Sequence, residues 1–191
     1  MERTFERVYT VTLRAGGDLN EPVQASILLR TKNDKAKNLG LPLPLGKAAL
    51  FEEVEGRPML LAESEIAAAA VGEEVEIGAG ESPDVLVTQW RAGHRCTDPE
   101  ADRDRDGDDC DDEGRRRRVR RMVVEVSNAR ADPVEVEVLL PLYHPWDIEK
   151  PSRDFVSKDG IRTWIARVPA NSRKRLTFTL RRQPEPRRDD D

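Results

Sequence analysis

The sequence has few of the residues that most enzymes use for nucleophilic or metal chemistry. Its 191 residues include only two histidines and two cysteines. Neither His94 nor His144 belongs to a G-x-S-x-G motif or to a similar constellation in which a base activates a nucleophile. His94 is near both cysteines, but the spacing matches no common zinc pattern. We therefore expect a protein that is not an enzyme and has no zinc site.

Long apolar runs are also absent from the sequence. No stretch approaches the roughly 20 apolar residues of a membrane-spanning helix. Residues 2–30 alternate polar and apolar types, so no signal peptide is visible. These features predict no membrane span and leave the localisation open. A chain that assembles inside a cell and later becomes extracellular or particle-associated would fit both this pattern and a later oxidation of its cysteines.

Helical periodicity is scarce, whereas alternation of apolar and polar residues recurs along the whole chain, as is typical of half-buried strands. The segments expected to form strands are 9–13, 23–29, 49–54, 58–62, 75–77, 85–87, 122–126, 134–138, 161–168 and 176–180. Glu55-Gly56 predicts a hairpin turn between two of them. The pattern predicts an all-β fold over residues 1–182, a β-sandwich of about ten short strands. The charged residues 183–191 are expected to form a disordered tail.

Charge is concentrated in one segment, an acidic insertion at residues 91–118. Between Asp98 and Glu113 there are ten acids and two arginines, a local charge of −8. The formal net charge of the chain is −5, so the remainder carries +3. The acidity is therefore a property of the predicted insertion and says little about partners of the whole chain.

Within this insertion, residues 102–113 fit D-x-D-x-D-G-x₅-E, the spacing of a twelve-position calcium loop. The predicted Ca²⁺ ligands are Asp102, Asp104, Asp106, Asp108 and Glu113. No amphipathic helices flank the motif, so it is closer to isolated calcium loops of extracellular modules than to an EF-hand. The alternative is a solvated acidic loop whose carboxylates pair with Arg115–Arg118. The same neutralisation within the chain is a simpler explanation of those arginines than nucleic-acid binding.

Cys96 and Cys110 are the only cysteines, and they lie within the same insertion. An even count in one long polar loop favours a local disulfide, which would contribute about 3 kcal/mol to stability if formed. The alternative is a pair of reduced thiols in a cytoplasmic protein. We expect the disulfide, because a long polar insertion has little else to hold it.

Several motifs, taken together and in order, indicate a family. They are the segments 33–46 (NDKAKNLGLPLPLG), 49–51, 71–77, 123–128, 133–136 and 168–171. In these segments the chain resembles the C-terminal module of bacterial mucoidy-inhibitor-A-like proteins (domain of unknown function 4139), over Thr10–Leu180. The resemblance implies a β-sandwich module of an envelope-associated protein with no established catalysis. Two departures are the lack of a long coiled-coil region and the longer, more acidic connection between Trp90 and Val119.

Three functions fit these observations. The first is a structural or interaction module that docks into a larger assembly, such as an envelope complex, a surface layer or a viral particle, in homo- or hetero-oligomeric form. The second is a soluble calcium-dependent binding or adhesion module. The third, a hydrolase that uses carboxylates, has less support because no pair of acids has a recognisable apolar surrounding. We expect protein partners and no nucleic acid.

Overall fold

The computed structural model describes residues 5–17, 19, 21–92 and 119–183. The strands are β1 (Glu6–Thr12), β2 (Val23–Lys32), β3 (Gly46–Val54), β4 (Arg57–Ile66), β5 (Glu74–Arg91), β6 (Val119–Asn128), β7 (Val134–Leu140), β8 (Trp146–Glu149), β9 (Val156–Lys158), β10 (Ile161–Val168) and β11 (Ser172–Arg182). A single 3-10 turn at Lys35–Lys37 is the only helical element of the described residues. The all-β prediction is confirmed. No helix in the described ranges has the length and apolar character needed to cross a membrane.

Nine strands form one continuous sheet in the order β8-β11-β6-β5-β2-β1-β7-β10-β9. The two halves of this sheet are joined through β1, which pairs antiparallel with β2 and parallel with β7. The sheet curls over on itself, because β10 approaches β6 and β11 although these strands are far apart in the hydrogen-bonded order. The described strands therefore differ from a sandwich of two separate sheets.

The strand β5 is 18 residues long and contains both of the short segments predicted at 75–77 and 85–87. Its pairing with β2 shifts register twice, between Gln24 and Ala25 and between Ser26 and Leu28. Gly80 in the same strand has a φ of +91°, which is accessible to glycine at little cost. These bulges and the glycine let one strand bend strongly without ending, so that it pairs with β2 along its length and with β6 near its end.

The hydrophobic core lies between the two halves of the curled sheet. Residues on β5, β6 and β11 contribute one side: Val85, Val87, Met122, Val124, Val126, Leu176, Phe178 and Leu180. Residues on β1, β7 and β10 contribute the other: Tyr9, Val11, Val136, Val138, Trp164 and Ala166. These positions alternate along each strand, so the period-two pattern of the sequence corresponds to the face that is buried.

Two buried asparagines hold the loops at the ends of strands. The Nδ2 of Asn128 donates to the carbonyls of Asp132, Val168 and Pro169, at 2.9, 3.3 and 3.0 Å. The side chain of Asn33 is fully buried and likewise donates to the backbone of the loops that precede β3 and follow β4. Each amide joins backbone carbonyls from several loop positions to one buried side chain, which fixes the path of these loops.

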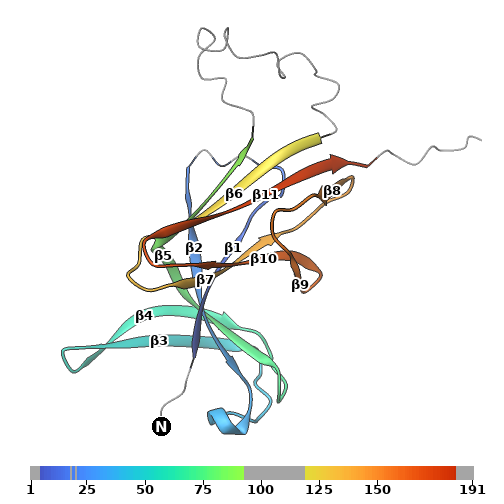
Figure 1. Ribbon diagram of the computed structural model, residues 1–191. Helices are drawn as coiled ribbons and strands as arrows, with labels where there is room; N and C mark the ends of the chain where they lie inside the picture. Colours follow the sequence, from blue (N-terminus) through green and yellow to red (C-terminus); the bar gives the residue numbers. More distant parts are fainter. Residues whose placement is uncertain (1–4, 18, 20, 93–118, 184–191) are drawn as a thin grey trace, which may run out of the picture.

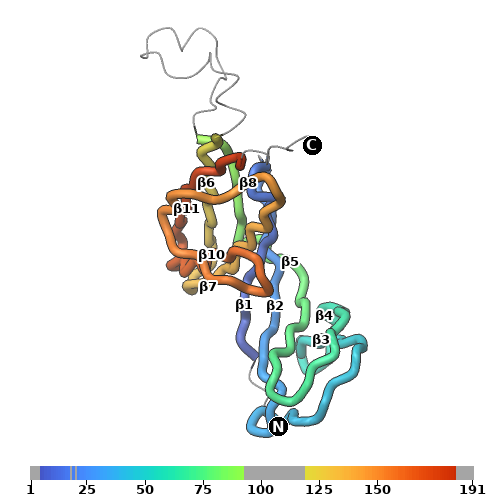
Figure 2. Tube along the Cα trace, turned by 90° about the vertical axis from the view of Figure 1, so that its right-hand side faces the viewer, coloured from blue at the N-terminus to red at the C-terminus, as the bar shows by residue number. Residues whose placement is uncertain are grey.

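The strands β3 and β4 form a separate ribbon, which we call the hairpin arm (residues 46–66). It lies beside the lower part of β5 and away from the strands β6 and β11 (Figures 1 and 2). The amide of Gly78 on β5 donates to Ser64 Oγ on β4 at 3.1 Å. Glu55 and Gly56 both have positive φ, 51° and 76°, as a two-residue hairpin turn requires. The predicted hairpin and its turn are confirmed.

Candidate functional site

The predicted calcium ligands and both cysteines lie outside the described residues. What the structure describes is the pair of strands that flank them. Arg91 of β5 pairs with Met122 of β6, and the amide of Ala92 donates to the carbonyl of Arg121 at 2.9 Å. Residues 93–118 therefore connect two adjacent antiparallel strands. Within the described ranges, no group of three or more His, Cys, Asp or Glu side chains is arranged to hold a metal ion.

The three tryptophans contribute to packing within the described part of the chain. Trp164 is buried in the core, with 3% of its surface exposed. Trp146 packs against the core, and the guanidinium of Arg120 lies 4.5 Å from its ring centroid. Trp90 is half-buried, and Arg175 lies 5.7 Å from its ring. His144 is exposed in the loop between β7 and β8.

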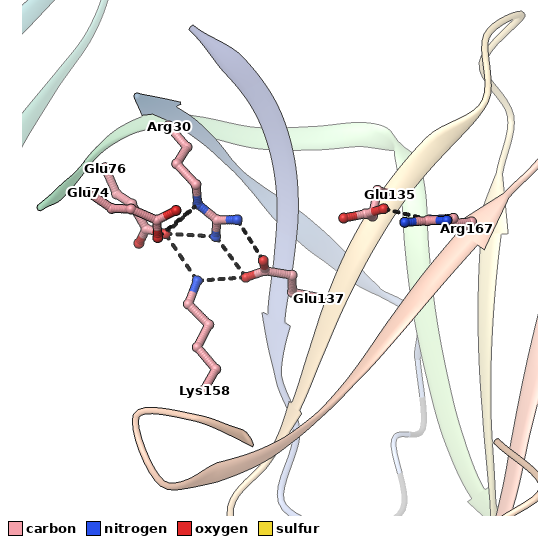
Figure 3. Close-up of polar contacts among 7 residues, drawn as sticks. All are labelled: Arg30, Glu74, Glu76, Glu135, Glu137, Lys158 and Arg167. Atoms are coloured by element: carbon pink, nitrogen blue, oxygen red, sulfur yellow. Dashed lines mark hydrogen bonds and ion pairs between the residues drawn. The ribbon is translucent and has the colours of Figure 1, made fainter. Parts of the chain in front are cut away.

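A cluster of four charged side chains joins strands that are distant in sequence (Figure 3). Arg30 on β2 donates from Nη1 and Nη2 to both carboxylate oxygens of Glu137 on β7, at 2.8 and 2.9 Å. Arg30 Nε also donates to Glu76 on β5 at 2.8 Å. Lys158 on β9 donates to Glu137 at 2.7 Å and to Glu76 at 3.0 Å. Glu76 and Glu137 are thus each shared by two cations, and Glu74, whose side chain is 65% exposed, lies 3.9 Å from Arg30 beside the cluster.

Burial makes these contacts strong. The side chain of Glu137 is 5% exposed, that of Arg30 15% and that of Lys158 26%. Burial acts to raise the pKa of Glu137, but the hydrogen bonds from Arg30 and Lys158 outweigh it and hold that pKa below its ordinary value. The pKa of Glu76 is lowered in the same way, against the effect of its burial. Hydrogen bonds to Glu137 are the main cause that raises the pKa of Arg30.

These ion pairs determine what the cluster can do chemically. A general acid needs a carboxyl whose pKa is raised toward the working pH, whereas Glu76 and Glu137 are both held ionised. A general base needs a free lone pair directed at a substrate, whereas these carboxylates accept hydrogen bonds from Arg30 and Lys158. The arrangement is suited to clamping the short edge strand β9 onto β2, β5 and β7.

Sequence reasoning did not find this cluster. Glu137 lies between the buried Val136 and Val138, so alternation assigns it to the opposite face of β7. That face was expected to be solvated, but Arg30 and Lys158 cover Glu137, which is among the buried polar residues. The signal that could have found it is weak, because each member is one ordinary charge in a strand.

The hairpin arm carries the most conspicuous apolar surface of the described residues. Phe51 is 62% exposed, and Met59, Leu60 and Leu61 are 56%, 54% and 58% exposed. A register shift between Leu50 and Phe51 places Leu60 directly opposite Phe51, so that their side chains share one face. The consecutive apolar residues 58–62 break the alternation of a half-solvated strand, and this was a sequence signal for an unusual surface.

The long edge of β3 is a second feature of the arm. In the described part of the chain, β3 is hydrogen-bonded to β4 alone, while β4 is the strand that approaches β5. The edge residues Ala48–Phe51 include neither charge nor proline, which are the usual devices that prevent strands from adding to an edge. Charges flank this stretch, with Lys47 on one side and Glu52 and Glu53 on the other.

Comparisons with protein families and with curated proteins found no match for this chain. No protein-family model matches it, and neither does any curated protein. The resemblance to the mucoidy-inhibitor-A-like module accordingly depends on the sequence motifs. Two residues of those motifs, Asn33 and Asn128, are the buried asparagines that hold loops in place, so part of the motif pattern has a structural cause.

Proposed function

We propose that this protein is a non-enzymatic interaction module that docks into a larger assembly through the hairpin arm. The observation that supports the proposal is the set of large apolar side chains exposed on a two-stranded ribbon that rests on β5 through β4, namely Phe51, Met59, Leu60 and Leu61. A two-stranded hairpin is marginally stable in water by itself, and large apolar side chains that stay exposed on one element are typical of interaction sites. A bound partner would bury these side chains.

The rest of the molecule suits the same role. A rigid curled sheet, clamped at the edge strand β9 by Lys158, would hold the arm in a defined position. The resemblance to a module of bacterial envelope-associated proteins with no established catalysis supports the same proposal. The acidic insertion supports the calcium-dependent binding module only through its sequence, at residues 102–113.

A photo-crosslinking amino acid at position 51 tests docking through the arm. We expect irradiation of cells that naturally produce the protein to yield a discrete adduct from this position. The matched control places the same amino acid at Arg167, an exposed position on the sheet whose side chain is 82% exposed. Adducts formed equally well from position 167, or no adduct from position 51, would contradict docking through the arm.

The absence of catalysis needs its own measurement. The purified protein is expected to show no turnover of ester, phosphate or glycoside substrates, because no nucleophile and base are recognisable in the sequence. Turnover that survives purification and disappears in the His144→Ala variant would contradict the non-enzymatic function.

A further inference from the structure

We propose that the hairpin arm pairs with the arm of a second copy of this chain, through antiparallel addition of one β3 to the other. This inference rests on the proposed docking function and names the partner. The free edge of β3 runs over Gly46–Val54, and its central residues carry no device that blocks strand addition. Joining two copies at this edge would convert two ribbons into one four-stranded sheet, which is far more stable than either ribbon.

The geometry of strand pairing limits how two copies can meet. An antiparallel pair of identical strands is related by a twofold axis perpendicular to the sheet, which keeps every side chain on its own face. Residues directly opposite each other must therefore come from the same face of β3. Lys47, Ala49, Phe51 and Glu53 share one face, because side chains alternate along a strand.

In one register, each charged residue of this face lies opposite a residue of the opposite charge. With the axis at Leu50, Lys47 lies opposite Glu53 of the second copy, and Ala49 lies opposite Phe51 of the second copy. The twofold axis repeats both contacts. Lys47, Phe51 and Glu53 are all exposed in the single chain, so they are available for these contacts. Opposite charges and aromatic–aliphatic neighbours are both favourable cross-strand pairs.

Other registers lose these pairs. If one strand slides by two residues along the other in either direction, Lys47 lies opposite Phe51 or Glu53 lies opposite Ala49.

The composition of the arm also disfavours anionic partners such as nucleic acid or an acidic lipid surface. Residues 46–66 contain five glutamates against Lys47 and Arg57, a net charge of −3. A second copy, by contrast, places its Lys47 opposite Glu53 of this edge.

The expected dimer is small and weak. Seven paired residues, 47–53, give a contact of roughly 23 Å in length at about 3.3 Å per residue. This contact falls at the low end of specific interfaces, so we expect a dissociation constant of about 1–100 µM. Sedimentation velocity of the purified full chain over a concentration series measures it directly.

Charge reversal separates this pairing from other modes of association. Lys47→Glu places two glutamates opposite each other at both ends of the contact, and Glu53→Lys does the same with two lysines. Each variant alone is expected to dimerise about tenfold or more weakly than the wild type. An equimolar mixture of the two is expected to recover the wild-type affinity, because both contacts of the mixed dimer then join a glutamate to a lysine.

Matched controls make the experiment decisive. Lys32→Glu and Glu55→Lys carry the same charge changes at exposed positions outside the paired segment, and they are expected to dimerise as the wild type does. Lys47 also lies opposite Glu65 within its own arm, so Lys47→Glu introduces a local repulsion. This local repulsion is also present in the mixture of the two variants. Recovery of dimerisation in the mixture would therefore come from the restored contacts between chains.

Three results would overturn the inference. The first is a wild-type chain that stays monomeric to about 300 µM, a concentration above the dissociation constants expected for so small an interface. The second is a dimer whose dissociation constant is unchanged by Lys47→Glu and by Glu53→Lys. The third is a mixture of the two variants that dimerises no more tightly than each variant alone. A monomeric chain whose position 51 still crosslinks to a different protein would overturn self-pairing and leave the docking function standing. A monomeric chain with no adduct from position 51 would overturn both.

Discussion

Replacing Glu137 by glutamine perturbs the buried charge cluster at its centre. The substituted amide would keep the shape of the side chain but lose the charge that Arg30 and Lys158 share. Removing one partner of a fully buried ion pair costs about 3–5 kcal/mol of unfolding free energy. The cationic partners are 15% and 26% exposed, and Glu76 stays in place, so water and the second carboxylate relieve part of the loss. We therefore expect a loss of about 2–3 kcal/mol.

The same strand provides a matched control. Glu135 is two residues away on β7 and accepts a hydrogen bond from Arg167 at 2.9 Å (Figure 3), but the Arg167 side chain is 82% exposed. Exposed pairs contribute about 0–1 kcal/mol, so Glu135→Gln is expected to cost little. Urea denaturation of both variants at neutral pH measures the difference. If Glu137→Gln destabilises the protein no more than Glu135→Gln does, the clamp role of the cluster is refuted.

The pH dependence of this difference has a defined sign. Hydrogen bonds from Arg30 and Lys158, acting against burial, hold the pKa of Glu137 below its ordinary value in the folded protein. A lowered folded pKa means that the stabilisation is complete above the unfolded pKa, about 4.3, and is lost as the pH falls through the folded value. The gap between wild type and Glu137→Gln should thus be constant from about pH 6 to 8 and shrink in acid. A gap that widens in acid would contradict the lowered pKa.

Three further predictions concern the core and the acidic insertion. Leu176→Ala, at a fully buried position, is expected to cost about 2–5 kcal/mol in urea denaturation, whereas Leu60→Ala, at a position 54% exposed, should cost less than about 1 kcal/mol; equal losses would contradict the location of the core. Calcium is expected to raise the melting temperature, and the double variant Asp104→Ala with Glu113→Ala should abolish that response while the sheet remains folded; calorimetry without a calcium heat would reject the site. Intact-mass measurement of protein from its native source is expected to find the two cysteines oxidised to a disulfide, and two free thiols would reject it.

Local patterning was enough to predict most of the strands, but it missed the short strands β8 and β9. Buried positions such as Val124, Val126, Val136 and Val138 alternate with polar residues, and they enter the core as that alternation predicts. Glu55-Gly56 predicted the turn of the hairpin arm, because a short glycine-containing segment between two strands favours a hairpin and glycine adopts positive φ at little cost. Strand alternation and the hairpin turn depend on residues that are neighbours in the sequence, so both can be predicted from it.

The arrangement of the strands depends on contacts between distant residues, and local patterning carries no record of those. The joining of both halves into one curled sheet requires β1 to pair with β7, more than a hundred residues away, and alternation only marks a strand without naming its neighbour. The same applies to Arg30 and Glu137, which meet only because β2 and β7 flank β1. The sequence by itself determined most of the strands and which of their faces are apolar. Only the tertiary structure decided which charges are buried together and which apolar side chains, those of the hairpin arm, are left exposed, because both depend on which segments the folded chain brings to cover them.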